Sequence, residues 1–173
     1  MNRWVVFAFA ACAVVTAGCD DNDTTSPSSQ PAVFSTILRP ANEVPPIAKA
    51  EANGVGAAQI TLQLTRSAGG AISAATADFY FQMSAFPGNT SVIGAHIHPG
   101  PAGINGPIVV STGLAVTAPF VANGATGEFR VTGIDVPPAL AQQIIDNPGG
   151  FYFNIHSPLN PGGFARGQLA RIQ

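Results

Sequence analysis

Hydrophobic and polar residues alternate along most of the chain, and this period of two predicts β-strands. The pattern is clearest in residues 54–65, where aliphatic side chains at every second position are separated by threonine and glutamine. Such a strand turns one face toward a core and the other toward water. The pattern returns in residues 72–83 after a glycine-rich turn, so these two strands are expected to pair as a hairpin. The other predicted strands are residues 33–38, 92–98, 108–110, 127–132, 151–156 and 164–172, with a less regular edge strand in residues 113–121.

One segment has a helical pattern instead. Residues 137–146 begin with prolines, place Leu140 and Ile144 one turn apart, and precede an Asn-Pro-Gly sequence that ends a helix. About eight short strands joined by frequent turns are typical of β-sandwiches. We therefore predict an all-β domain, built as a two-sheet antiparallel sandwich with this short helix capping one end.

The composition agrees with this architecture. Of the 173 residues, 46% are hydrophobic and 9% are charged, against a charged share of about 25% in typical proteins. The 19 glycines and 15 prolines suit short strands joined by tight turns. The length fits a single domain. With a net charge of -2 and seven scattered Lys and Arg residues, the chain has no predicted basic surface, which argues against nucleic acid as a partner.

The N-terminus is predicted to be an export signal. Residues 1–18 combine Arg3 with an apolar run and small residues before Cys19. The run is shorter than the span of about 20 residues that crosses a bilayer core. Residues 16–19 resemble a bacterial lipobox, in which the cysteine thiol receives diacylglycerol and becomes the first mature residue; Thr16 stands where that pattern prefers leucine. The alternative is an ordinary secretory cleavage near Gly18.

Export predicts residence in the cell envelope, either periplasmic or at the cell surface. Under the lipobox interpretation, the membrane is a partner through the lipid on Cys19, and residues 19–32 form a disordered tether because they are polar and poor in apolar side chains. Since Cys12 is removed with the signal, the mature chain holds one cysteine and is expected to form no internal disulfide.

The candidate chemistry lies in residues 94–110, GAHIHPGPAGINGPIVV. The spacing of His96 and His98 places both on one face of a strand that glycine and proline then end. His156 lies on a later strand, on the face opposite its apolar residues. Three neutral imidazoles on two neighbouring strands suit a Cu or Zn ion. The alternative is that the histidines hydrogen-bond loop backbones and hold the glycine- and proline-rich loop.

Asn154 and Arg166 are candidate supporting polar residues near the same segments. Arg166 either steers an anion toward the histidines or donates to loop carbonyls as a structural group. Glu43 is interpreted as a loop anchor. We predict no catalytic residue, because the chain has no carboxylate pair assigned by spacing, no G-x-S-x-G motif and no phosphate-binding loop.

Four motifs, in order, resemble those of the CHRD domain, first defined as a repeat in the extracellular growth-factor antagonist chordin and found in many microbial secreted proteins. The resemblance covers residues 33–173 and implies an extracytoplasmic, immunoglobulin-like β-domain used as a module. Phe164 departs from the family pattern, which usually has an acidic residue there. The motifs are ANEVPP (41–46), GAHIHPGPAGINGPIV (94–109), FYFNIH (151–156) and PGGFARGQL (161–169).

The chain is also loosely similar to copper-zinc superoxide dismutase, through its H-x-H strand, its later single histidine and a G-x-x-R-G sequence. The bridging histidine, the zinc-ligand cluster and the cysteine pair of that family have no counterpart here. The two resemblances imply a Greek-key β-sandwich, immunoglobulin-like or superoxide-dismutase-like. We expect a membrane-anchored, non-enzymatic module that binds a protein or glycan. The alternative is a Cu- or Zn-binding domain with superoxide-dismutase-like redox activity through His96, His98 and His156.

The lipobox interpretation predicts that cells incorporate labelled palmitate into the wild-type chain and lose this label in Cys19→Ala. Incorporation is expected to continue in Cys12→Ala, because Cys12 lies in the segment that the signal peptidase removes. A wild-type chain that carries no label would contradict the lipobox and favour ordinary secretory cleavage.

Overall fold

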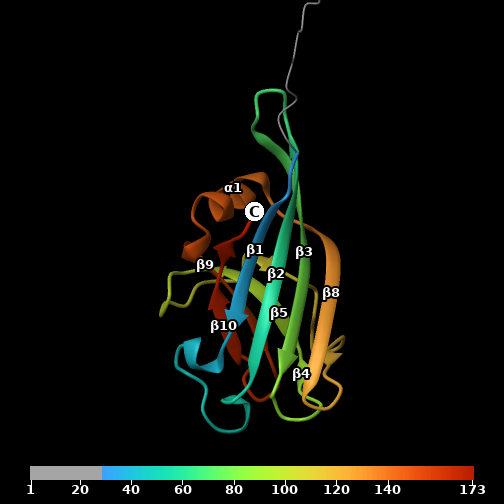
Figure 1. The fold of residues 1–173 in the computed structure, drawn as a ribbon, viewed down its shortest axis with the longest axis vertical. Coiled ribbons are helices and arrows are strands. Elements are labelled where there is room, and N and C mark those ends of the chain that lie inside the picture. Colours follow the sequence, from blue (N-terminus) through green and yellow to red (C-terminus); the bar gives the residue numbers. More distant parts are fainter. Residues whose placement is uncertain (1–28) are drawn as a thin grey trace, which may run out of the picture.

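The computed structural model describes residues 29–173, which form two main antiparallel β-sheets with one α-helix beside them (Figure 1). The predicted signal segment, Cys19 and most of the predicted tether lie outside the described residues. No helix within residues 29–173 is long and apolar enough to cross a membrane. The fold confirms the predicted all-β antiparallel sandwich with one short helix.

Five strands form the larger sheet, in the order β11 (Ala170–Arg171), β1 (Ala32–Leu38), β2 (Val55–Arg66), β3 (Ile72–Ser84) and β8 (Thr126–Asp135). The predicted hairpin is confirmed, because β2 pairs with β3 and places Ile60 opposite Phe79. The alternation along β2 is also confirmed: Ile60, Leu62 and Leu64 are buried, whereas Gln59 and Gln63 are exposed. The period of two in the sequence therefore reports the two faces of this sheet correctly.

Four strands form the smaller sheet, in the order β10 (Ala165–Gln168), β9 (Phe151–His156), β5 (Gly94–Pro99) and β6 (Val110–Ser111). Strand β9 is central and pairs with both β10 and β5. Its register places Asn154 opposite His96 on one side and Arg166 on the other. The two strands that carry the histidines are therefore direct neighbours.

The predicted edge strand 113–121 is mostly a loop. Only Phe120–Val121 is extended, and this short strand, β7, pairs with β4 (Ser91–Val92) in a separate two-stranded sheet. Gly113 has a φ of +83°, a left-handed conformation that interrupts a strand. Two-residue strands such as these raise the number of strands within residues 29–173 to eleven, where the sequence predicts about eight.

The predicted last strand, residues 164–172, is divided between the two sheets. Strand β10 pairs with β9 in the smaller sheet, and β11 pairs with β1 in the larger one. Leu169 lies between them and is buried. The segment crosses from one sheet to the other and links the two layers near the C-terminus. Its two halves therefore pair with different strands.

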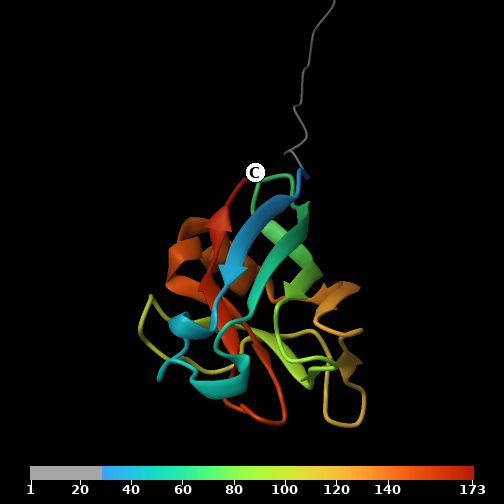
Figure 2. The same cartoon turned by 60° about the horizontal axis from the view of Figure 1, so that its bottom comes forward.

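Helical turns occupy the connections between strands. The predicted helix is confirmed as α1 (Pro138–Asp146), with Ala141 and Ile144 buried against the core. Figures 1 and 2 show that the segment between β1 and β2 lies near the loop that follows β5. A hydrogen bond from Asn105 Nδ2 to the carbonyl oxygen of Val44, at 3.0 Å, joins these two segments. The 3₁₀ helices are η1 (Pro40–Asn42), η2 (Lys49–Glu51) and η3 (Pro148–Gly150).

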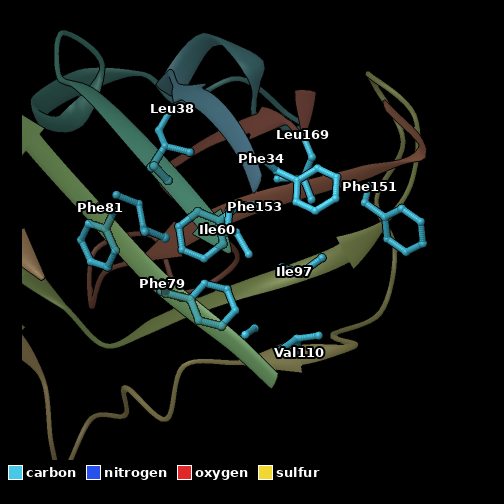
Figure 3. Close-up of a cluster of buried hydrophobic side chains, with 14 of the residues drawn as sticks. Phe34, Leu38, Ile60, Phe79, Phe81, Ile97, Val110, Phe151, Phe153 and Leu169 are labelled. Atoms are coloured by element: carbon cyan, nitrogen blue, oxygen red, sulfur yellow. The ribbon is translucent and has the colours of Figure 1, made fainter. Parts of the chain in front are cut away.

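The core lies between the two sheets and is rich in phenylalanine (Figure 3). Phe79 of β3 stacks on Phe153 of β9 with 5.7 Å between the ring centroids, and Phe81 lies 6.1 Å from the same ring. All three side chains are fully buried. Burial of each contributes on the order of 1.5–3 kcal/mol. This packing fixes β9 in the sandwich and thereby positions the residues on its other face.

We expect Phe153→Ala to lower the free energy of unfolding by about 3–5 kcal/mol, because it removes a ring that contacts both sheets and leaves a cavity. Urea unfolding followed by circular dichroism measures this loss. Val116→Ala is the control: its side chain is 74% exposed, so its effect is expected to stay within about 0.5 kcal/mol. Similar stabilities of the two variants would contradict the assigned core.

Candidate metal centre

The three histidines lie together on the face of the smaller sheet that points away from the core. His96 and His98 come from β5 and His156 comes from β9. Nδ1 of His96 lies 2.9 Å from Nε2 of His156. The ring centroid of His98 lies 5.8 Å from that of His96 and 6.1 Å from that of His156. One ring nitrogen from each histidine lies within 4.8 Å of the others. The structure thus brings together all three residues that the sequence singles out.

Two glycines allow the histidines and the following loop to pack this closely. A Cβ atom on Gly94 would lie 2.8 Å from Cε1 of His96, so the imidazole occupies the space of the missing side chain. A Cβ atom on Gly106 would lie 1.7 Å from the carbonyl oxygen of Pro99. Only glycine lets the loop return so near the end of β5. This return places the carbonyl of Gly106 beside His98.

Backbone carbonyls determine the tautomers of two histidines. Nδ1 of His98 lies 3.0 Å from the carbonyl oxygen of Gly106, and Nδ1 of His156 lies 2.9 Å from that of Pro161. A carbonyl oxygen only accepts, so each Nδ1 must carry the proton and donate it. In the neutral ring, Nε2 then keeps its lone pair. Nε2 of His98 is buried and has no hydrogen-bond partner.

The site favours neutral imidazoles. The pKa of His96 is lowered to about 4, mainly by burial and also by repulsion from His156 and His98. Burial also lowers the pKa of His98 and of His156, although backbone carbonyls, and for His98 also the side-chain amide of Asn154, act in the opposite direction. All three rings are therefore neutral at pH 7, which is the form that binds metal ions.

The histidine face of β9 is buried, which the alternation alone did not indicate. The sequence predicts apolar residues on one face of this strand and polar residues on the other, yet all six are buried, and Asn154 is only 2% exposed. The loop after β5 covers this face. Its Gly106 N–H donates to the hydroxyl of Tyr152 at 3.2 Å. The polar residues therefore lie in an enclosed environment.

Arg166 and Gln168 hold the loops around the site. Nε of Arg166 donates to the carbonyl oxygen of Asn42 at 2.6 Å, and Nη1 donates to Oδ1 of Asn105 at 2.7 Å. Nε2 of Gln168 donates to the carbonyl oxygen of Gly100 at 2.9 Å. These contacts match the structural alternative for Arg166, donation to loops. Asn154 lies closer to the histidines, with Oδ1 2.9 Å from Nε2 of His156.

Glu43 is a buried carboxyl beside Arg166, with 3.8 Å between Oε2 and Nε. Its pKa is raised to about 7, because the effect of burial exceeds the opposing effects of the Arg166 charge and a hydrogen bond with Asn154. Two of the polar atoms in this pair, Oε1 of Glu43 and Nη2 of Arg166, have no hydrogen-bond partner. Glu43 thus connects the first loop of the domain to Asn154, which fits its predicted role as an anchor.

Sequence reasoning assigned no role to Tyr152, which forms one wall of the site. Its ring is nearly parallel to that of His98, with 4.9 Å between the centroids and 4° between the planes. The guanidinium of Arg166 lies 4.6 Å from the centre of the same ring on β9. The signal was present in the sequence, because Tyr152 shares the face of Asn154 two residues away.

Comparison with protein families gives one result for the chain. The family model described as CHRD domain matches residues 34–169. This range contains all three histidines together with Glu43, Asn154 and Arg166. No curated protein and no solved structure matches the chain.

In the metal-free protein, we expect His96 to titrate near pH 4, as followed by its ring resonances in NMR with a chelator present. An unfolded chain protonates histidine near pH 6.5, so stability that His96 contributes at neutral pH is lost as the pH falls from 6.5 toward 4. A titration midpoint at or above 6.5 would contradict the burial assigned to this ring.

Urea unfolding of wild type and His96→Gln tests the same expectation on stability. The pH-dependent loss is expected to be smaller in the variant. Glu43 acts in the opposite direction, because its raised pKa means that stability is lost as the pH rises from about 4.5 to about 7. Since this carboxyl is present in both proteins, the difference between them reports His96.

Proposed function

The chain belongs to the CHRD domain family, and we propose that this member is a lipid-anchored module of the cell envelope that binds one Cu or Zn ion through His96, His98 and His156. The single observation that carries the proposal is the buried Nε2 of His98, which has no hydrogen-bond partner and belongs to a cluster of three imidazoles. A buried polar atom without a partner is costly, and a metal ion would satisfy it.

The hydrogen bonds around the rings support this role. In metal sites, the ring nitrogen of histidine that does not bind the metal usually donates to a carbonyl or carboxylate, which fixes the tautomer and ring orientation. The carbonyls of Gly106 and Pro161 do this for His98 and His156. The ligand set would consist of imidazoles, which suit Cu and Zn better than Mg or Ca.

The spacing of the rings is close to what one ion requires. Nitrogens bound at about 2.0–2.1 Å in a tetrahedral site lie about 3.4 Å from one another. The candidate ligand atoms lie within 4.8 Å, so small side-chain rotations suffice to bring them onto one ion. Among residues 29–173, these histidines form the only group of three or more His, Cys, Asp or Glu side chains placed in this way.

We prefer metal binding to the protein- or glycan-binding role because it accounts for a buried atom that otherwise lacks a partner. The anchoring part of the proposal rests on the apolar residues 1–18 and the lipobox-like segment that ends at Cys19. Together, these features support a metal-binding domain tethered to the outside of the membrane it has crossed.

The purified protein is loaded with Zn²⁺ or Cu²⁺, freed of excess metal and analysed for its metal content. We expect about one ion per chain in wild type and a loss of this ion in His96→Ala/His98→Ala. The matched control is Gln59→Ala/Thr61→Ala, which has the same two-residue spacing on the outer face of the larger sheet. Its metal content is expected to equal that of wild type.

A second measurement follows thermal unfolding with and without the ion. Metal bound to the folded chain raises the midpoint in wild type and in the control, but not in the histidine variant. Equal metal content in wild type and the histidine variant would overturn the proposed site, as would a wild type that retains no ion.

A further inference from the structure

Asn154 lies between the histidine cluster and the buried Glu43–Arg166 pair. It is an interior residue of the central strand β9 and is 2% exposed. Its cross-strand neighbours are His96 on β5 and Arg166 on β10. The side-chain amide therefore has one polar environment on each side, and its two ends have different hydrogen-bonding properties: the oxygen accepts and the nitrogen donates.

The carboxyl of Glu43 determines which way the amide points. The hydrogen bond with Asn154 acts to lower the pKa of Glu43, as donation to the carboxylate does. A Cβ atom on Gly163 would lie 2.6 Å from Nδ2 of Asn154 and 2.9 Å from Oε1 of Glu43, so these two groups share the space that the glycine leaves. With Nδ2 directed to Glu43, the oxygen Oδ1 faces the histidines.

This orientation places two hydrogen-bond acceptors in contact. Oδ1 of Asn154 lies 2.9 Å from Nε2 of His156. That nitrogen has a lone pair in the neutral ring, because Nδ1 donates to the carbonyl of Pro161. When Glu43 is ionised, turning the amide around would place Oδ1 against its carboxylate, so the contact between acceptors would move and would not disappear. A cation bound by both atoms resolves the conflict.

We propose that Oδ1 of Asn154 is the fourth ligand of the metal ion, so that the centre has three imidazole nitrogens and one amide oxygen. This inference rests on the proposed function. It predicts a filled tetrahedral site, whereas catalytic zinc sites usually keep one position open for water or substrate. The centre would therefore hold its ion in a closed site and would not present it to a substrate.

Charge compensation supports the same arrangement. All four donors are neutral, so the bound ion keeps its positive charge within a largely buried site. The carboxyl of Glu43, which shares the space at Gly163 with the amide of Asn154, favours this charge when it is ionised, and it lies 3.8 Å from Nε of Arg166. The Arg166 charge also acts on His98 and opposes the ion there. Glu43 is thus a positioning residue that orients the amide oxygen toward the ion.

The test compares Asn154→Ala with Asn154→Asp. Both variants lose the amide group that donates to Glu43, but only the aspartate variant keeps an oxygen that can bind the ion. We expect Asn154→Ala to weaken Zn²⁺ binding by about 10-fold or more and to change the electron paramagnetic resonance spectrum of the Cu²⁺-loaded protein. Asn154→Asp is expected to retain most of the affinity. Asn123→Ala, an exposed asparagine in the turn before β8, is the matched control.

The outcomes separate this inference from the proposed function. A wild type that binds no metal overturns both. Suppose that wild type binds metal, but that Asn154→Ala keeps its Zn²⁺ affinity or that both Asn154 variants lose the same affinity. This result overturns only the fourth ligand and leaves the three-histidine site. Thermal unfolding of the metal-free variants shows whether each one is folded.

A measurement on wild type alone completes the test and needs no variant. NMR follows the side-chain amide resonances of Asn154 and Asn123 as Zn²⁺ is added. We expect the resonances of Asn154 to shift and those of Asn123 to remain unchanged. An unshifted Asn154 amide in the Zn²⁺-loaded protein would overturn its assignment as a ligand.

Discussion

The site depends on one constraint, the burial of the polar face of β9. Loops cover His156, Asn154 and Tyr152, so their polar atoms must find partners within the protein. An unpaired buried group costs about 1–3 kcal/mol. The carbonyls of Gly106 and Pro161 satisfy one nitrogen each of His98 and His156. Nε2 of His98 is left without a partner, and Nε2 of His156 keeps a lone pair beside Nδ1 of His96 and Oδ1 of Asn154. Such a group of nitrogen and oxygen atoms favours a cation.

The loops stay in place because β10 anchors them. Arg166 and Gln168 on this short strand donate to backbone carbonyls of three connecting segments, at Asn42, Gly100 and Gly149. Hydrogen bonds from a charged guanidinium contribute more than neutral ones. The burial of Arg166 is tolerated because Glu43 and the ring of Tyr152 lie against it. The core beneath, with Phe153 packed on Phe79, holds β9 against the larger sheet.

Predictions from the sequence were correct where the residue pattern of a single strand, hairpin or helix determines its structure. The β2–β3 hairpin, α1 and the shared face of His96 and His98 all follow from residues that are near in sequence. Predictions were wrong where pairing partners decide the structure. The last strand divides because its two halves pair with different sheets, and residues 113–121 remain mostly a loop because only Phe120–Val121 pairs with another strand.

The sequence by itself determined the class of fold, the two faces of each long strand and the side chains that can bind a metal, because alternation along a strand is a local property of the backbone. Only the tertiary structure decided that β5 and β9 are neighbours, that loops bury the polar face, and that Asn154 lies between Glu43 and His156. These features join residues that are up to more than a hundred positions apart in the sequence. Such contacts depend on how the strands pair and pack, and they leave no periodic signal in the chain.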